Sequence, residues 1–139
     1  EKKPLKLNST EYVELLLADL RLLISDNGSL RTYYLLGVPY SSKFNAFECL
    51  AGTELLGNRL LGGCDDYQEK GVSLINEALS GFSNEYNNVE FIDPNDFLCV
   101  KVGCMVINDR EPIHSDRRHL SVYGADFVIN GVVRKLNED

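Results

Sequence analysis

Apolar residues recur at helical spacing in three stretches of the chain. Over residues 9–26, leucine, valine and isoleucine repeat every three or four positions, which predicts an amphipathic helix. Asn8 followed by Glu11 forms a capping-box pattern, so we expect this helix to begin there. The same periodicity predicts a second helix over Glu69–Phe82 and a closing helix over Leu120–Leu136.

Between the helical stretches lie shorter apolar segments typical of strands. Arg31–Val38 is almost continuously apolar or aromatic, which predicts a buried parallel strand. Val89–Ile92 predicts a second strand, and Phe97–Val100 with Cys104–Ile107 predicts a small hairpin around Gly103. Alternating helices and strands indicate an α/β domain built on a parallel sheet.

The length of the chain limits its organisation. With 139 residues, 44% of them hydrophobic, the sequence suffices for a single domain, 1–139, with a hydrophobic core. Residues 40–68 are expected to hold one or two short irregular helices. Two long strands are few for a parallel sheet, so the unit looks incomplete.

The charge and the apolar runs exclude two classes of partner. A net charge of −7 and a pI near 4.8 argue against nucleic-acid binding, which needs a basic surface. The longest apolar run, Leu15–Ala18, is far shorter than the roughly 20 residues of a membrane span. The first residues lead into no apolar signal segment, so export would depend on something upstream.

Four cysteines, Cys49, Cys64, Cys99 and Cys104, leave two interpretations open. No pair has the CxxC spacing, so neither a metal site nor a redox motif is expected. The cysteines are either buried free thiols of a cytosolic protein or two disulfides of a protein in an oxidising compartment. Composition alone does not decide between them.

The residues with the clearest chemical potential are Asp116 and His119. A carboxylate three residues before an imidazole can accept a hydrogen bond from Nδ1–H and leave Nε2 to take a proton from a hydroxyl nucleophile. Taken by itself, this spacing more commonly marks a capped helix start with an exposed histidine. The neighbouring sequence favours the chemical interpretation.

The segments around this pair, LCxxxxC, PIHSD and HLSxYGA, follow one another in residues 98–125. This segment resembles the C-terminal block of the SGNH hydrolase-like domain attached to acyltransferase-3 membrane proteins, the bacterial carbohydrate O-acetyltransferases. The resemblance covers most of the chain, but only about the last 30 residues are specific. It implies part of a flavodoxin-like, three-layer SGNH-hydrolase fold with a parallel sheet and a small disulfide-linked hairpin.

The resemblance also implies roles for individual residues. Asp116 would be the orienting carboxylate, and His119 the general base and then the general acid. His114 stands where the family often has an aromatic residue. It is a candidate substrate contact, with a packed or exposed bystander as the alternative.

Two further features follow from the resemblance. It implies disulfides Cys99–Cys104, in the hairpin, and Cys49–Cys64. The family's nucleophilic serine lies in a Gly-Asp-Ser motif, which does not occur in these 139 residues. We therefore expect the chain to be the C-terminal portion of an SGNH-like domain without its nucleophile block, and to be inactive alone.

The function implied is transfer of an acyl group, most simply acetyl, to a carbohydrate hydroxyl at the periplasmic face of the bacterial inner membrane. Its expected partners are an acyl donor, a carbohydrate acceptor, the N-terminal part of the domain and a membrane acyltransferase domain. No cofactor or metal is expected. A carbohydrate esterase and a non-catalytic carbohydrate-binding or assembly module of the same fold are the alternatives.

Overall fold

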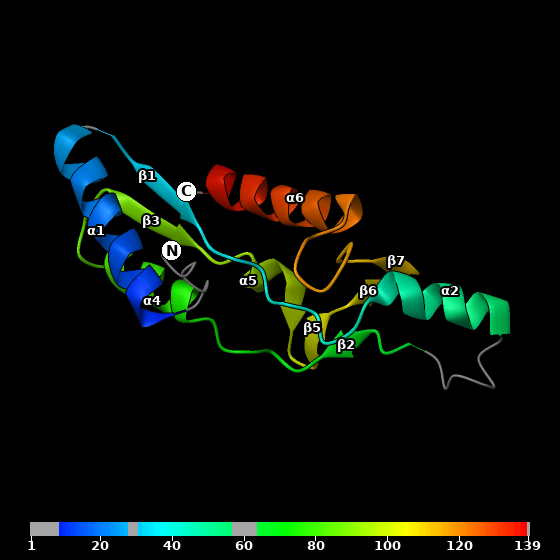
Figure 1. The fold of residues 1–139 in the computed structure, drawn as a ribbon. Helices are drawn as coiled ribbons and strands as arrows, with labels where there is room; N and C mark the ends of the chain where they lie inside the picture. Colours follow the sequence, from blue (N-terminus) through cyan, green and yellow to red (C-terminus); the bar gives the residue numbers. More distant parts are fainter. Residues whose placement is uncertain (1–8, 28–30, 57–63, 139) are drawn as a thin grey trace. The chain divides into compact units, whose positions relative to one another are not determined.

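A computed structural model of the chain describes residues 9–27, 31–56 and 64–138 (Figure 1). The chain divides into two compact units. Unit 1 consists of Glu1–Val38 and Val72–Asp93, and unit 2 consists of Pro39–Gly71 and Pro94–Asp139. Each unit therefore combines an early and a late part of the sequence.

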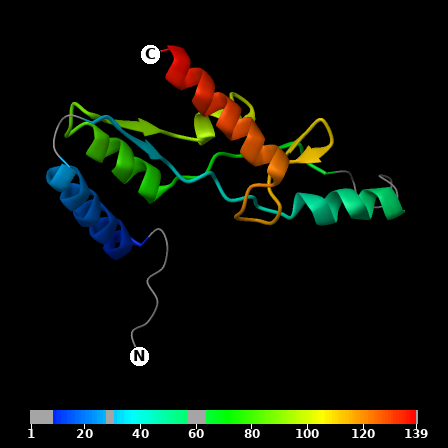
Figure 2. The ribbon, with the colours of Figure 1, turned by 90° about the horizontal axis from the view of Figure 1, so that it is seen from above.

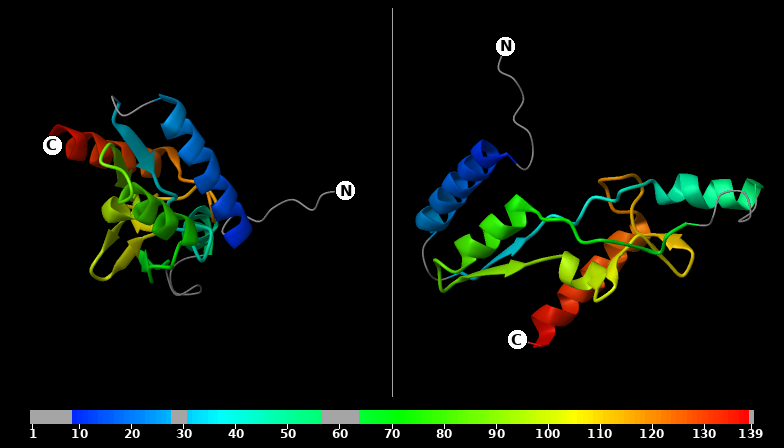
Figure 3. Two further views of the ribbon diagram at one scale, coloured as in Figure 1. Left: turned by 90° about the vertical axis from the view of Figure 1, so that its left-hand side faces the viewer. Right: turned by 90° about the horizontal axis from the view of Figure 1, so that it is seen from below.

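Unit 1 holds the parallel strand pair. Its elements are α1 (Thr10–Asn27), β1 (Tyr33–Leu36), α4 (Leu74–Ser83) and β3 (Val89–Ile92). The two strands pair in parallel with Tyr33 opposite Val89, and both helices pack beside them (Figure 3). Both helices and both strands contribute side chains to one core, whose members are Leu17, Leu20, Ile24, Tyr33, Leu35, Phe82, Tyr86 and Val89.

The two faces of β1 differ in burial. Tyr33 and Leu35 point into the core, whereas Tyr34 and Leu36 are 51% and 56% exposed. The prediction of a parallel strand is confirmed, but the prediction that it is buried throughout is wrong. Successive residues of a strand point to opposite faces, and α1 and α4 cover the face of Tyr33 and Leu35.

The helix starts in unit 1 are set by serine caps. The Ser9 hydroxyl accepts a hydrogen bond from the Tyr12 N–H, so Ser9 caps α1, while the predicted cap, Asn8, lies outside the described residues. Ser73 caps α4 by accepting from the Asn76 N–H. The second helix therefore begins five residues later than predicted, because Ser73 supplies the acceptor that the first turn needs.

Unit 2 contains the antiparallel strands and the closing helix (Figure 2). Its elements are α2 (Ala46–Leu56), β2 (Tyr67–Gln68), α5 (Asn95–Leu98), β4 (Cys99–Val100), β5 (Gly103–Met105), β6 (Ile107–Asn108), β7 (Glu111–Pro112) and α6 (Val122–Glu138). One sheet has the order β2-β5-β4, and β6 with β7 forms a separate hairpin. The main core comprises Tyr40, Leu98, Cys104, Met105, Ile113 and Val128.

The predicted cysteine hairpin is confirmed as β4 and β5, although Phe97 and Leu98 belong to α5. Gly103 at its turn has φ 146° and lies so close to β2 that a Cβ would come within 2.4 Å of the Gln68 carbonyl oxygen. A side chain is excluded there by both constraints. Neither the β6–β7 hairpin nor its turn was predicted. In that turn Asp109 and Arg110 adopt φ values of 51° and 66°, the conformation that a tight two-residue hairpin requires.

Two disulfides link elements of unit 2. Cys99 and Cys104 face each other across the β4–β5 hairpin, and Cys49 of α2 is bonded to Cys64, ahead of β2. These are the two pairs that the family resemblance implies. The observed architecture is thus a mixed α/β fold with a parallel strand pair and a disulfide-linked hairpin.

Candidate acid–base site

Asp116 and His119 lie on a short closed loop, residues 114–120, between β7 and α6. An antiparallel bridge between His114 and Leu120 closes the loop, and the Ser115 N–H donates to the His119 carbonyl over 2.8 Å. The simplest interpretation of the spacing was a capped helix start. The structure instead places the pair in a loop, and α6 begins only at Val122. The pair sits at the tip of a loop that is fixed by its own backbone bonds.

The Asp116 carboxylate holds the turn together. Its Oδ1 accepts from the N–H groups of Arg118 and His119, over 2.6 Å and 2.8 Å. Its Oδ2 lies 2.7 Å from Nδ1 of the His119 ring. These hydrogen bonds lower the pKa of Asp116 well below its usual range, and the bond from the His119 ring contributes most. The carboxylate is therefore ionised at neutral pH.

The position of one proton on the His119 ring follows from the state of Asp116. An ionised carboxylate can only accept hydrogen bonds, so the proton between the two side chains belongs to Nδ1 of His119. Whenever the ring is neutral, Nε2 carries its lone pair. The His119 side chain is 77% exposed, so this nitrogen belongs to an imidazole that an incoming hydroxyl group can approach.

Ser121 and Gly124 explain why the motif continues as LSxYGA. The Ser121 hydroxyl donates to the carbonyl of Pro112 and accepts from the N–H of Gly124, so it caps α6. The Ser121 N–H also donates to the Ile113 carbonyl over 2.9 Å. A Cβ on Gly124 would come within 2.0 Å of that same carbonyl oxygen, so only glycine permits this approach of helix and loop.

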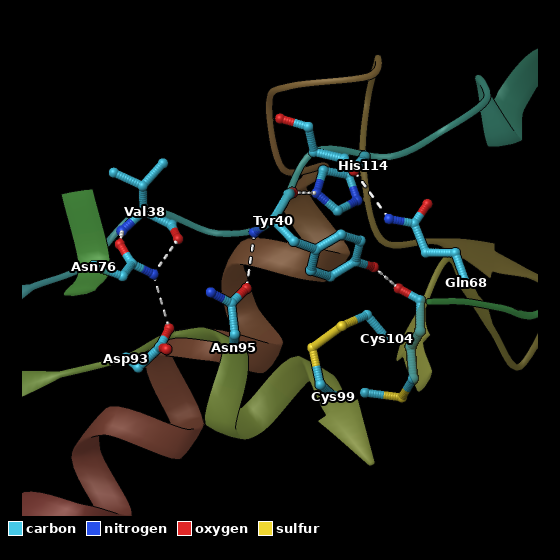
Figure 4. The surroundings of a disulfide bond; sticks show 11 residues. Val38, Tyr40, Gln68, Asn76, Asp93, Asn95, Cys99, Cys104 and His114 are labelled. Atoms are coloured by element: carbon cyan, nitrogen blue, oxygen red, sulfur yellow. Dashed lines mark hydrogen bonds between the residues drawn. A yellow bond between two sulfur atoms is a disulfide. The ribbon is translucent and has the colours of Figure 1, made fainter. Parts of the chain in front are cut away.

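The His114 side chain lies in the core of unit 2 and is not exposed to solvent. Its side chain is fully buried, with Nε2 2.8 Å from the Tyr40 carbonyl oxygen and the ring packed edge-on against the Tyr40 ring (Figure 4). Burial lowers the pKa of His114 and keeps the ring neutral. The ring is thus packed against Tyr40 in the core of unit 2, as the packed alternative has it.

The chain segment around Tyr40 is the part of the site that the sequence did not reveal. The Tyr40 N–H donates to the Asn95 side chain over 2.8 Å (Figure 4). The Gln68 side chain accepts from the Lys43 N–H and donates to the Ser41 carbonyl. Gln68 and Asn95 are buried polar residues. Such side chains in apolar surroundings indicate specific partners, but their spacing in the sequence does not identify them.

A polar hollow of about 430 Å³ adjoins the loop. Its lining includes Arg117 from the loop together with Phe44, Asn45, Glu48, Cys49, Cys64 and Asp65. In the described part of the chain, no group of three or more histidine, cysteine or acidic residues could hold a metal ion. Nor is any helix there long and apolar enough to cross a bilayer.

The fold and this loop define a domain of the SGNH class. Residues 5–133 match the family described as the SGNH domain fused to AT3 domains, and the chain belongs to that family. The comparison with curated protein sequences found no significant match.

A solved structure shares the fold. It is the periplasmic domain of the lipopolysaccharide acetyltransferase of Salmonella ser. Paratyphi A, similar with a TM-score of 0.64 and 22% sequence identity. The match covers 94% of this chain and 52% of that chain, so this chain spans about half the length of the solved domain.

Proposed function

We propose that this domain serves a membrane-bound O-acyltransferase that transfers acetyl groups to a cell-surface carbohydrate on the periplasmic side of the bacterial inner membrane. The observation that carries the proposal is the 2.7 Å contact between Asp116 and the Nδ1 of an exposed His119. Membership of a family fused to AT3 domains supports it, as does the fold shared with an acetyltransferase periplasmic domain.

In the proposed reaction His119 acts twice. Its Nε2 removes the proton from a serine hydroxyl as the serine oxygen bonds to the acyl carbon and the donor's leaving group departs with that proton. Nε2 then removes the proton from the sugar hydroxyl that attacks the acyl-enzyme, and returns it to the serine. Asp116 fixes the ring tautomer and stabilises the imidazolium in both halves.

The serine is assigned to residues outside this sequence, because the 139 residues contain no Gly-Asp-Ser. By the same proposal the donors of the oxyanion hole come from that part of the protein. The hollow beside Arg117 offers a polar surface next to the loop where part of the carbohydrate acceptor can lie.

The test uses the full-length protein that carries this domain, expressed in cells whose surface polysaccharide is extracted and analysed for O-acetyl groups by NMR. His119→Ala should lower turnover by several orders of magnitude, because the members of a triad act as one unit. Asp116→Asn should lower it by roughly 10⁴-fold or less, because the wrong ring tautomer then faces the serine. Arg118→Gln is the matched control on the same loop, since Arg118 contributes its backbone N–H to Asp116.

The possible outcomes separate the candidate functions. Loss of O-acetyl groups in the His119 and Asp116 variants, with Arg118→Gln unchanged, supports transfer. Near-normal O-acetylation in His119→Ala would refute the assigned role and favour a non-catalytic module. A wild-type protein that removes O-acetyl groups from the polysaccharide, rather than adding them, would identify a carbohydrate esterase.

A further inference from the structure

The 114–120 loop is rigid within itself but needs an anchor. The Asp116 carboxylate and the backbone bridge between His114 and Leu120 determine its shape. Asp116 and His119 are themselves exposed, so packing does not hold the tip of the loop in place. The orientation of the acid–base pair must therefore be set by the contacts that join the loop to the rest of unit 2.

Two contacts with the segment around Tyr40 provide this attachment. His114 Nε2 lies 2.8 Å from the Tyr40 carbonyl oxygen, and the Ser42 N–H donates to the Arg117 carbonyl over 2.8 Å. The first contact is fully buried at the base of the loop, and the second reaches its tip. Tyr40 is itself fixed, because its N–H bonds Asn95 and its hydroxyl donates to the Met105 carbonyl.

The chemistry of the contact requires a neutral ring with a defined tautomer. A carbonyl oxygen only accepts, so Nε2 of His114 carries the proton and donates it. Nδ1 then holds a lone pair, and it has no hydrogen-bond partner among the residues that the structure describes. An apolar ring would fill the same space without an unsatisfied acceptor, but it could not bond the Tyr40 carbonyl. The hydrogen bond of His114 thus fixes the orientation of the ring, which apolar packing alone would not do.

We propose that His114 is a positioning residue: by bonding the Tyr40 carbonyl and packing on its ring, it orients the loop that presents His119 and Asp116. This inference rests on the proposed function for its catalytic meaning, but its structural content is testable without activity. His114 acts through the loop and touches no substrate. Its replacement should therefore change the state of the His119 ring.

The first experiment records ring-nitrogen NMR spectra of the 139-residue chain in mildly alkaline buffer. Wild-type His119 should show the Nδ1–H tautomer with a slowly exchanging proton. In His114→Phe this signal should broaden or shift toward a tautomer mixture, and in His114→Gln, which restores an N–H donor, it should return. Val128→Ala is the control, because it removes apolar volume from the same core and leaves every side chain that bonds within the loop in place.

The second experiment measures kinetics in the full-length protein. A misplaced catalytic group costs on the order of 10²-fold in rate, so His114→Phe should lower kcat by about that factor with a smaller change in KM, and His114→Gln should restore most of it. An unchanged His119 signal in His114→Phe would overturn the proposal. So would a signal change as large in Val128→Ala, or no recovery in His114→Gln. If His114→Phe does not fold, His114→Leu, which also lacks the N–H donor, replaces it in both experiments, and the same outcomes decide.

The two proposals fail separately. A His119 signal that follows the His114 series supports positioning even if His119→Ala retains acetyl transfer, a result that would remove only the proposed function.

Discussion

The close approach of α6 to the loop makes Gly124 the most informative single position for stability. In Gly124→Ala the new Cβ would lie 2.0 Å from the Ile113 carbonyl oxygen and 2.9 Å from its carbon, so the helix start and the strand end must separate by more than an ångström. Ile113 is fully buried, its N–H donates to Val106, and its carbonyl accepts from Ser121. The substitution must disturb both bonds.

The expected size of the effect comes from three contributions. Overpacking of a buried site costs about 1–3 kcal/mol. Each weakened backbone hydrogen bond costs about 0.5–1.5 kcal/mol. Replacing glycine by alanine in a helix returns about 1 kcal/mol. We therefore expect Gly124→Ala to lower the free energy of unfolding by about 3 kcal/mol.

Gly81 supplies a control with the same chemical change. It lies within α4, is exposed, and a Cβ built on it meets no atom within 4 Å. Gly81→Ala should therefore raise the free energy of unfolding by about 0.5–1 kcal/mol. Urea unfolding of the oxidised chain, followed by circular dichroism and by tyrosine fluorescence, measures both variants and shows whether the transition is two-state.

A Gly124→Ala protein as stable as wild type would refute the reasoning, because the overlap with Ile113 would then be relieved at no cost. The same result would show that the start of α6 does not constrain the position of the 114–120 loop. If the reasoning holds, Gly124→Ala should also disturb the ring signal of His119, since Ile113 directly precedes His114.

Two further expectations concern the disulfides and pH. By loop-closure entropy, Cys49→Ala with Cys64→Ala should cost about 3 kcal/mol for a separation of 15 residues, and Cys99→Ala with Cys104→Ala about 2 kcal/mol for a separation of 5, in urea unfolding. Alkylation of the unreduced wild type should label no thiol in intact-mass spectra, and four labelled thiols would contradict the disulfides. Burial lowers the pKa of His114 from its ordinary value of 6.5. Between pH 6.5 and the lowered pKa, His114 therefore takes up a proton in the unfolded chain but not in the folded chain. Stability should therefore be full above pH 6.5 and fall below it, by at most about 1.4 kcal/mol per pH unit, until pH reaches the lowered pKa. His114→Gln should lack this component, and an identical pH profile for the two proteins would show that His114 is not the group responsible.

Local patterns determined a large part of the fold. The periodicity of apolar residues placed α1 and α6 to within a few residues, and the short apolar run at 89–92 coincides with β3. The cysteine hairpin followed from two strand-like segments around a glycine. The contact of Asp116 with His119 was also predictable, because three residues of a turn keep the two side chains within reach of each other.

The tertiary structure decided which residues are buried and what they bond. His114 reads as a loop residue beside a polar motif, yet it is fully buried against Tyr40, 74 positions earlier in the chain. Gly124 falls within the predicted closing helix, where its spacing shows no special role, yet the backbone of Ile113 requires a glycine there. Helix periodicity and turn geometry depend on neighbours within a few residues, so the sequence displays them directly. Burial and hydrogen-bond partners depend on segments that meet only in the folded chain, and no local pattern records where those segments lie.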